Sequence, residues 1–595
     1  MTTQAATQPR RETFTAEVDP VALEVMRARL MSIVREMTVT LYRTSYSTII
    51  REVHDFSCVL LDRQARLVAQ AEGIPLFNGS MSPVLEGVLQ KFPLDQLFPG
   101  DVIISNDPYQ GGGTHKNDVN IVMPIFHQGE LVLFSASKCH YTDIGGKDPG
   151  SWSGDARNSF QEGLMIPPLK LFEGSKKNQA VFDLFFANIR TPEWSRGDLE
   201  AQIAAGKTAE RRTLEFLDKY GWPTVSATIE ALIDHGERVA RAHIERIPDG
   251  VYTAECFVDS DGVVDEPVPL KLAVTVEGSN MTFDFTGSAA QRGGACGNEA
   301  WVATVSVCRE TVTFLAGASL SANEGSYRPI HVVAPEGTIV RPLPPAPLTT
   351  GIGDVGTRVI ELILQALAPV IPEEVIAGTF GCVQVMSIAG TDPTTGKEYL
   401  HFSPYAGGWG GRARYDGNGS MVSLLSGDNY NIPCEVMETK FPALLAERFT
   451  LREGSAGSGK HRGGLGVSYD YRLLTDGEFL VSMDREKFPP HGLFGGKAGL
   501  PNVTVVNPDT PAEQQFAKVA GYQVNAGTVL SHRTAGGGGY GDPWERDPQL
   551  VLDDVRNEYM SVEAAREDYG VVINPVRWSV DEAETTRLRG KARTS

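Results

Sequence analysis

Two histidine–aspartate pairs are the residues of this sequence that could do chemistry together. His115 and Asp118 stand three positions apart, and His140 and Asp143 repeat this H-x-x-D spacing twenty-five residues later. Imidazole nitrogens and carboxylate oxygens are ligands that suit zinc, manganese or iron. The pattern therefore indicates a candidate site for a divalent transition metal, with these four side chains as its candidate catalytic residues.

A further carboxylate, Asp55, precedes a strand-like run in the same part of the chain. Each histidine pair also adjoins such a run, so loops at neighbouring strand ends could bring the side chains together. Asp55, His115, Asp118 and His140 would form a mixed nitrogen and oxygen ligand set. Such a set leaves a position open for water or substrate, as catalytic metal sites do. Asp143 would then orient His140 or act as a base.

The same residues also have a simpler interpretation. Aspartate beside glycine often caps turns, and histidine often makes an ordinary hydrogen bond, so the spacing leaves a loop-capping role open. Cys139 next to His140 does not indicate a nucleophilic pair, because adjacent residues of a strand point to opposite faces. Cys58 and Cys139 are expected to be buried small hydrophobes. No G-x-S-x-G motif of a serine hydrolase occurs.

Glycine clusters at Gly111–Gly113 and Gly536–Gly539 could bring backbone N–H groups close to an anion. Neither cluster matches a P-loop, and the basic segment Lys460–Gly464 is not a nucleotide motif either. We expect these glycines mainly to make tight turns. The chain thus has no ATP site that a motif would identify.

The elements that must position these residues mix helices and strands. Apolar residues recur every three or four positions from Leu23 to Leu41, which predicts a long helix that begins at Asp19-Pro20. Strands are predicted at Ser57–Leu61, Asp101–Ser105, Val119–Phe126, Leu131–Ser135, Leu272–Val276 and Met281–Phe285. Further helices are predicted at Asp198–Tyr220, Val225–Ile247, Val302–Leu315, Gly356–Leu367, Pro548–Asn557 and Ser561–Tyr569. The pattern indicates an α+β protein of several domains with Gly-rich loops, without the βαβ spacing of a doubly wound sheet.

Shifts in composition suggest where one domain ends and the next begins. Residues 1–17 are expected to form a flexible tail. An N-terminal α/β metal-binding domain would cover 18–250, and a β-rich domain 251–340. A Gly-rich mixed α+β domain would cover 341–545, and a C-terminal helical tail 546–595.

The overall composition excludes several classes of protein. The 595 residues carry a formal net charge of −20, which argues against nucleic-acid and anionic-membrane binding. No run of 18 apolar residues occurs, so no membrane span is expected. The seven cysteines are scattered without a C-x-x-C pair, which is typical of reduced thiols in the cytoplasm.

Several short blocks, in order along the chain, resemble the hydantoinase B/oxoprolinase family. The most recognisable block runs from Asn106 to Asp118 and contains Asn-Asp-Pro-Tyr and Gly-Gly-Thr-His. The other blocks are Gln161–Lys170, Gly197–Gln202, Asp284–Gly287, Asn323–Gly325 with Arg328–Ile330, Gly459–Gly464, Pro489–Gly496 and Gly536–Pro543. Together they span nearly the whole chain.

The resemblance implies an ATP-dependent amidohydrolase with a separate ATP-binding subunit similar to hydantoinase A. That partner would hold ATP and Mg and phosphorylate the amide oxygen of a lactam, hydantoin or 5-oxoproline. This chain would hold a transition metal through His115, Asp118 and His140, with Asp55 as the candidate fourth ligand. Water activated at this site would open the ring. The resemblance also implies a hetero-oligomer with two copies of each subunit.

Two other functions stay open. The resemblance extends to acetone and acetophenone carboxylases, in which the activated ketone is carboxylated instead of hydrolysed. A third function, of another class, is a non-catalytic scaffold for the ATP-binding subunit. The candidate metal ligands argue against a scaffold, because a scaffold has no need of them.

One block departs from the family. Many relatives carry a histidine shortly before a Gly-Ser-Met element, whereas Phe77 and Asn78 stand there in this chain. A histidine therefore has no role at this point, and the departure suggests a different substrate.

Overall fold

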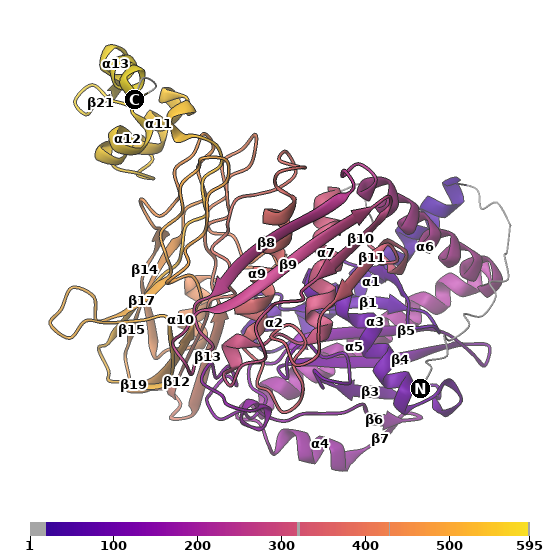
Figure 1. The fold of residues 1–595 in the computed structure, drawn as a ribbon. Coiled ribbons are helices and arrows are strands. Elements are labelled where there is room, and N and C mark those ends of the chain that lie inside the picture. The colour runs from indigo at the N-terminus through magenta and orange to yellow at the C-terminus, as the bar shows by residue number, and fades with distance from the viewer. Residues whose placement is uncertain (1–19, 318–321, 428, 593–595) are drawn as a thin grey trace.

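The computed structural model describes residues 20–317, 322–427 and 429–592; the predicted tail at 1–17 lies outside them. Helices and mainly antiparallel sheets follow one another without the regular alternation of a doubly wound fold (Figure 1). The predicted α+β class is confirmed. Among the described residues, no helix is both long and apolar enough to cross a membrane.

The N-terminal part of the chain is built on a seven-stranded antiparallel sheet. In spatial order its strands are β2 (Leu67–Gln70), β1 (Phe56–Leu61), β5 (Glu130–His140), β4 (Asp118–His127), β3 (Val102–Ser105), β6 (Leu169–Glu173) and β7 (Lys176–Lys177). The helices around it are α1 (Pro20–Thr44), α2 (Thr48–Arg51), α3 (Pro75–Lys91), α4 (Gln179–Phe186), α5 (Pro192–Tyr220) and α6 (Trp222–Ile244). The first helix, predicted from Asp19-Pro20 onward, is present from Pro20, the first described residue.

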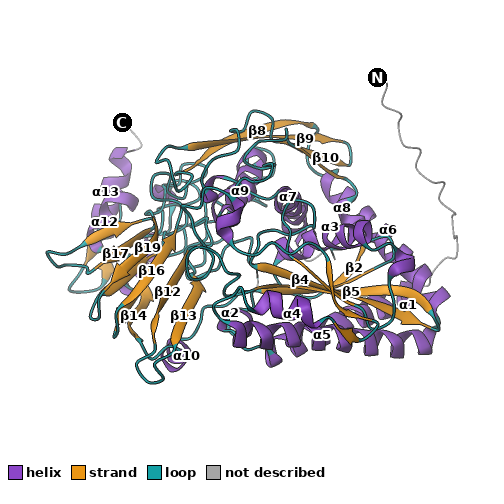
Figure 2. Ribbon diagram, turned by 90° about the horizontal axis from the view of Figure 1, so that it is seen from below, coloured by secondary structure: helices purple, strands orange, loops and turns teal. Residues whose placement is uncertain are grey.

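Helices cover both faces of this sheet (Figure 2). Successive side chains of a strand point to opposite faces, so Cys58 and Leu60 join the core under α1 and α5. Val59 and Leu61 join a separate core under α3. The central strands are therefore buried on both faces.

A second sheet packs against a buried helix. Its strands in spatial order are β11 (Ile330–Val333), β10 (Asn280–Asp284), β9 (Val268–Glu277) and β8 (Gly250–Val258). The helices beside it are α7 (Trp301–Ala316), α8 (Glu324–Tyr327) and α9 (Gly351–Leu367). Helix α9 contacts β8 and β9 on one side and α7 on another, so it is buried along almost its whole length.

Two more sheets face each other across an aromatic-rich core. The first has the order β13 (Glu398–Pro404), β12 (Val385–Thr391), β16 (Gly477–Ser482) and β19 (Lys518–Val524). The second has the order β14 (Leu444–Leu451), β15 (Val467–Leu473), β20 (Val529–Arg533), β17 (Val503–Val506) and β18 (Gln514–Phe516), with α10 (Cys434–Lys440) alongside. Side chains from both sheets form one core cluster.

Beside these sheets, glycine-rich segments hydrogen-bond to one another as a bundle of extended chains, which we call the glycine bundle. Its segments are 407–411, 457–466, 492–499 and 535–541. Within it, Gly537 N–H donates to the Gly464 carbonyl at 2.9 Å, and Gly464 N–H donates to the Trp409 carbonyl at 2.7 Å. A Cβ on any of Gly536–Gly539 would lie 1.9–2.1 Å from a backbone oxygen.

The expectation that Gly536–Gly539 makes a tight turn is wrong. None of its four residues has a positive φ, so glycine is needed there for close backbone approach and not for a left-handed conformation. In the other cluster, Gly112 does have a φ of +68°, as a turn requires.

The chain ends in a small unit with its own core, drawn in yellow in Figure 1. It consists of α11 (Pro548–Arg556), α12 (Val562–Tyr569), β21 (Ile573–Asn574), β22 (Ser579–Val580) and α13 (Glu582–Ala592). The largest core cluster, by contrast, runs from Met26 to Tyr540 and crosses the predicted boundaries at 250 and 340. The first three predicted domains therefore share one core, and their division stays a prediction.

Candidate metal centre

A β-hairpin brings the candidate ligands together. Asp118 is the first residue of β4 and His140 the last residue of β5, and the antiparallel register places these two directly opposite each other. His115 lies in the turn before β4, where the Asp118 N–H donates to the His115 carbonyl at 3.1 Å. The separation of twenty-five positions between the two histidines is thus spanned by one hairpin, and His115, Asp118 and His140 meet at strand ends.

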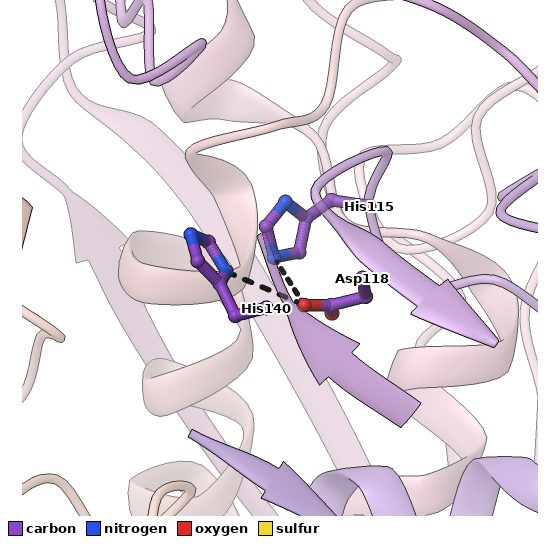
Figure 3. Close-up of side chains that lie close together, drawn as sticks. All are labelled: His115, Asp118 and His140. Atoms are coloured by element: carbon purple, nitrogen blue, oxygen red, sulfur yellow. Dashed lines mark ion pairs between the residues drawn. The ribbon is translucent and has the colours of Figure 1, made fainter. Parts of the chain in front are cut away.

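The three side chains converge on one point (Figure 3). Oδ1 of Asp118 lies 3.1 Å from Nε2 of His115 and 3.4 Å from Nδ1 of His140. One candidate ligand atom from each residue lies within 4.8 Å of the other two. All three side chains are buried. The arrangement has the donor types and the compactness of a metal site.

Several polar atoms of this cluster lack a hydrogen bond. Nδ1 of His115, Oδ1 of Asp118 and Nε2 of His140 have no hydrogen-bond partner among the described residues. Leaving buried polar atoms unpaired is costly, so native sites of this kind usually serve a ligand or an ion. Two imidazole nitrogens and a carboxylate oxygen fit zinc, manganese or iron, and the residues present therefore fit the predicted metal.

The charge of Asp118 also fits a cation. Burial by itself would raise the pKa of this carboxyl, but His115 and His140 beside it hold the pKa well below its usual range. Its other oxygen, Oδ2, accepts a hydrogen bond from the Thr114 hydroxyl, which fixes the carboxylate. Asp118 therefore stays ionised at the centre of the cluster.

Asp55 lies beside the three-residue cluster. Its neighbour Phe56 pairs with Cys139, and the His140 N–H donates to the Asp55 carbonyl at 3.0 Å. The Asp55 side chain lines the same cavity as His115 and His140. Burial raises the pKa of its carboxyl to about 7, with His140 lowering this pKa and Asp118 raising it. Asp55 is well placed to approach an ion, and its role as the fourth ligand stays a prediction.

Asp143 is not brought to the cluster. Its buried carboxylate accepts hydrogen bonds from the backbone N–H groups of Gly145, Gly150 and Arg190, from the Ser151 hydroxyl and from the Arg190 guanidinium. These partners belong to the loop that follows β5 and to the segment before α5. The contacts favour support of the loop over the predicted catalytic roles.

The Asp143→Asn variant separates loop support from base catalysis. Loss of a buried, fully hydrogen-bonded charge should destabilise the protein by about 3 kcal/mol, while the metal content stays that of the wild type. Thermal unfolding and metal analysis of the purified variant measure both. A base would behave in the opposite way, with unchanged thermal stability and activity lower by about 10² to 10⁴-fold.

The site is closed by aromatic side chains that the sequence analysis did not identify. Trp152 packs edge-on against His115 with ring centroids 5.3 Å apart, and Phe402 stacks on His140 at 4.9 Å. Together with apolar residues from α9 and β12 they enclose a cavity of about 30 Å³. Trp152 follows His140 by only twelve residues, so proximity was a usable signal. Phe402 comes from β13, and no local pattern connects it to this site.

The departure from the family pattern also falls on this cavity. Phe77 lines it beside His115 and His140. Asn78 is buried in α3, and its side chain is hydrogen-bonded to the Ser57 hydroxyl. Of the two residues that depart from the expected pattern, Phe77 thus places an apolar ring in the wall of this cavity.

The cysteines next to the site are inert. Cys58 and Cys139 are both buried, as expected. Burial raises the pKa of Cys58 to about 12 and raises the pKa of Cys139 as well. A thiol that stays protonated is a poor nucleophile, so neither cysteine competes with the histidines for a catalytic role.

Comparison with known proteins identifies the family. The family model of hydantoinase B/oxoprolinase matches residues 19–543. The chain belongs to the hydantoinase B/oxoprolinase family. The resemblance seen in the sequence blocks is therefore confirmed, and the match includes all residues of the candidate metal centre.

Individual members show how far the likeness extends. The chain is 32% identical over 598 residues to the caprolactamase subunit beta of Pseudomonas jessenii, covering 96% of this chain and 98% of that protein. The crystal structure of the ATP-dependent caprolactamase from P. jessenii superimposes with a TM-score of 0.89 at 30% identity, covering 97% and 100% of the chains. A nucleotide-free acetone carboxylase shares the fold, with a TM-score of 0.88 at 20% identity, covering 97% and 83%.

Proposed function

We propose that this chain is the metal-dependent subunit of an ATP-dependent amidohydrolase that opens cyclic amides. The observation that carries the proposal is the buried cluster of His115, Asp118 and His140, in which one candidate ligand atom of each residue lies within 4.8 Å of the other two. The similarity to an ATP-dependent caprolactamase over almost the whole chain supports it. Zinc, manganese or iron is the proposed metal, and Asp55 the proposed fourth ligand.

The proposal includes a partner. No P-loop motif occurs in this sequence, and a relative that matches along its whole length is named as a subunit. A hydantoinase A-like subunit is therefore proposed to bind ATP and Mg, in an assembly with two copies of each chain. The cysteines are all unpaired, which supports a location in the reducing cytoplasm.

The chemistry follows from the weakness of an amide as an electrophile. Transfer of the terminal phosphoryl group of ATP to the amide oxygen, on the partner, makes the carbonyl carbon attackable. A bound divalent metal would supply acidification of water and stabilisation of developing negative charge. His115, Asp118 and His140 would hold that metal ion, and the aromatic wall of Trp152 and Phe402 keeps bulk water out. The net reaction consumes the lactam, ATP and two water molecules, one to open the ring and one to release phosphate, and yields an amino acid, ADP and phosphate.

Ketone carboxylation is the main alternative, and a purified complex can distinguish it. With caprolactam as substrate, the complex should release ADP in step with the ring-opened amino acid, without bicarbonate. ADP release that requires a ketone and bicarbonate would overturn the hydrolase proposal in favour of a carboxylase. Full lactam turnover by a variant without the metal ligands would leave the chain with the role of a scaffold.

A further inference from the structure

A second cavity lies directly beside the candidate metal centre. Its volume is about 340 Å³, within the range of small-molecule sites. Helix α7 forms one wall with residues at positions i, i+3, i+4 and i+7. The principal lining residues are Leu76, Val307, Glu310, Phe314, Trp409 and Leu425. We call this cavity the apolar chamber.

The apolar chamber and the metal cavity share a partition. Leu76 and Leu425 line both. Val307 at the inner end is 1% exposed, whereas Phe314 on the same helix is 36% exposed, so the chamber extends from the surface inward to this partition. The metal cavity of about 30 Å³ has room for only one or two waters. A substrate ring must therefore be held next to the cluster, and the apolar chamber is the adjoining space of sufficient size.

The side chains that line the chamber restrict the kinds of ligand that it can bind. Among the described residues, Glu310 is the one ionisable side chain that lines the chamber. The hydroxyl groups of Thr311 and Thr313 are engaged by helix carbonyl oxygens. The remaining lining is mainly hydrocarbon and aromatic, so a ring with several polar groups would leave them unpaired at a cost.

Glu310 is the polar anchor of the chamber. Its Oε1 accepts a hydrogen bond from the Tyr327 hydroxyl, and no hydrogen bond from a described residue reaches its Oε2. Burial raises the pKa of this carboxyl to about 7. With no hydrogen bond from a described residue, this second oxygen can bind one polar group of a ligand, and an amide N–H fits that position.

We propose that the apolar chamber binds a lactam with an aliphatic ring, with Glu310 as the hydrogen-bond partner of the amide. This inference rests on the proposed function and specifies which cyclic amides the site accepts. Hydrocarbon lactams are preferred over hydantoins, because the second carbonyl and second N–H of a hydantoin would have no partner among the apolar walls.

The test measures caprolactam binding to the purified chain by calorimetry and by saturation-transfer NMR, without ATP. Val307→Trp fills the inner end, and Thr313→Trp fills the partly exposed outer end of the same wall. Val305→Trp, on α7 but outside the lining, is the matched control. We expect Kd to rise by about tenfold or more in both chamber variants and to stay unchanged in the control. Unchanged metal content and thermal unfolding would show that the variants are folded.

The outcomes separate this inference from the proposed function. Wild-type binding of caprolactam at least about tenfold tighter than hydantoin, lost in both chamber variants, would support it. Equal binding of the two ligands, or undiminished binding in a folded Thr313→Trp variant, would overturn it. In the complex with its partner, the Thr313→Trp variant can be assayed for lactam turnover. An unchanged KM would overturn the proposed role of the apolar chamber and leave the proposed function intact. Absence of any ATP-dependent lactam turnover by the wild type would instead overturn the proposed function.

Discussion

The His115→Ala variant should lose turnover by about 10³-fold or more, because charge stabilisation by a catalytic metal contributes several kcal/mol. His115 is buried and supplies one of the three converging candidate ligand atoms. The variant should still assemble with the ATP-binding partner, since the His115 side chain is buried and does not reach the surface of the protein. Steady-state assays of the purified complex, with assembly checked by size-exclusion chromatography, measure both results.

His127→Ala is the matched control for this experiment. His127 lies on the same hairpin but pairs with Asp218 at the surface, 3.0 Å away. Exposed pairs of this kind contribute little, so this variant should turn over like the wild type. Full activity of His115→Ala, or equal loss in His127→Ala, would contradict a catalytic role for the cluster.

The Gly537→Ala variant should fail to accumulate as folded protein. Its Cβ would lie 2.0 Å from the Trp409 carbonyl oxygen, and the neighbours that must shift are backbone atoms of the glycine bundle. Overpacking of a rigid interior costs about 3 kcal/mol, and more where no side chain can give way. Soluble yield and thermal unfolding check this expectation.

Gly293→Ala provides the comparison. Its Cβ would meet no atom within 4 Å, and its φ is not in the left-handed region. This variant should be as stable as the wild type or slightly more so, because alanine restricts the unfolded chain. Normal stability of Gly537→Ala would show that the bundle is looser than its hydrogen bonds indicate.

The convergence of the three candidate metal ligands could be predicted from the sequence because their spacing reflects local structure. His115, Asp118 and His140 belong to one hairpin, so their separation along the chain determines their meeting in space. The same spacing failed for Asp143. In the first H-x-x-D pair the aspartate begins a strand, whereas in the second the histidine ends one. After His140 the chain leaves the sheet, and the Asp143 carboxylate accepts hydrogen bonds from the loop that follows instead of joining the cluster.

The surroundings of the site could not be predicted, because they depend on distant contacts. Phe402 reaches His140 from a sheet more than 250 residues further along the chain. The apolar chamber combines parts of α3, α7 and α9, whose own patterns indicate only buried helices. The glycine clusters look alike in sequence whether they make a turn, as at Gly112, or allow close backbone packing, as at Gly537.

Metal content, measured by mass spectrometry on freshly purified protein, tests the central claim most directly. The wild type and His127→Ala should contain about one transition metal per chain, and His115→Ala and His140→Ala should contain little or none. Absence of metal from the wild type, with none taken up when zinc, manganese or iron is supplied, would contradict the account. Metal retained in both ligand variants would contradict it equally, because the ion would then lie elsewhere.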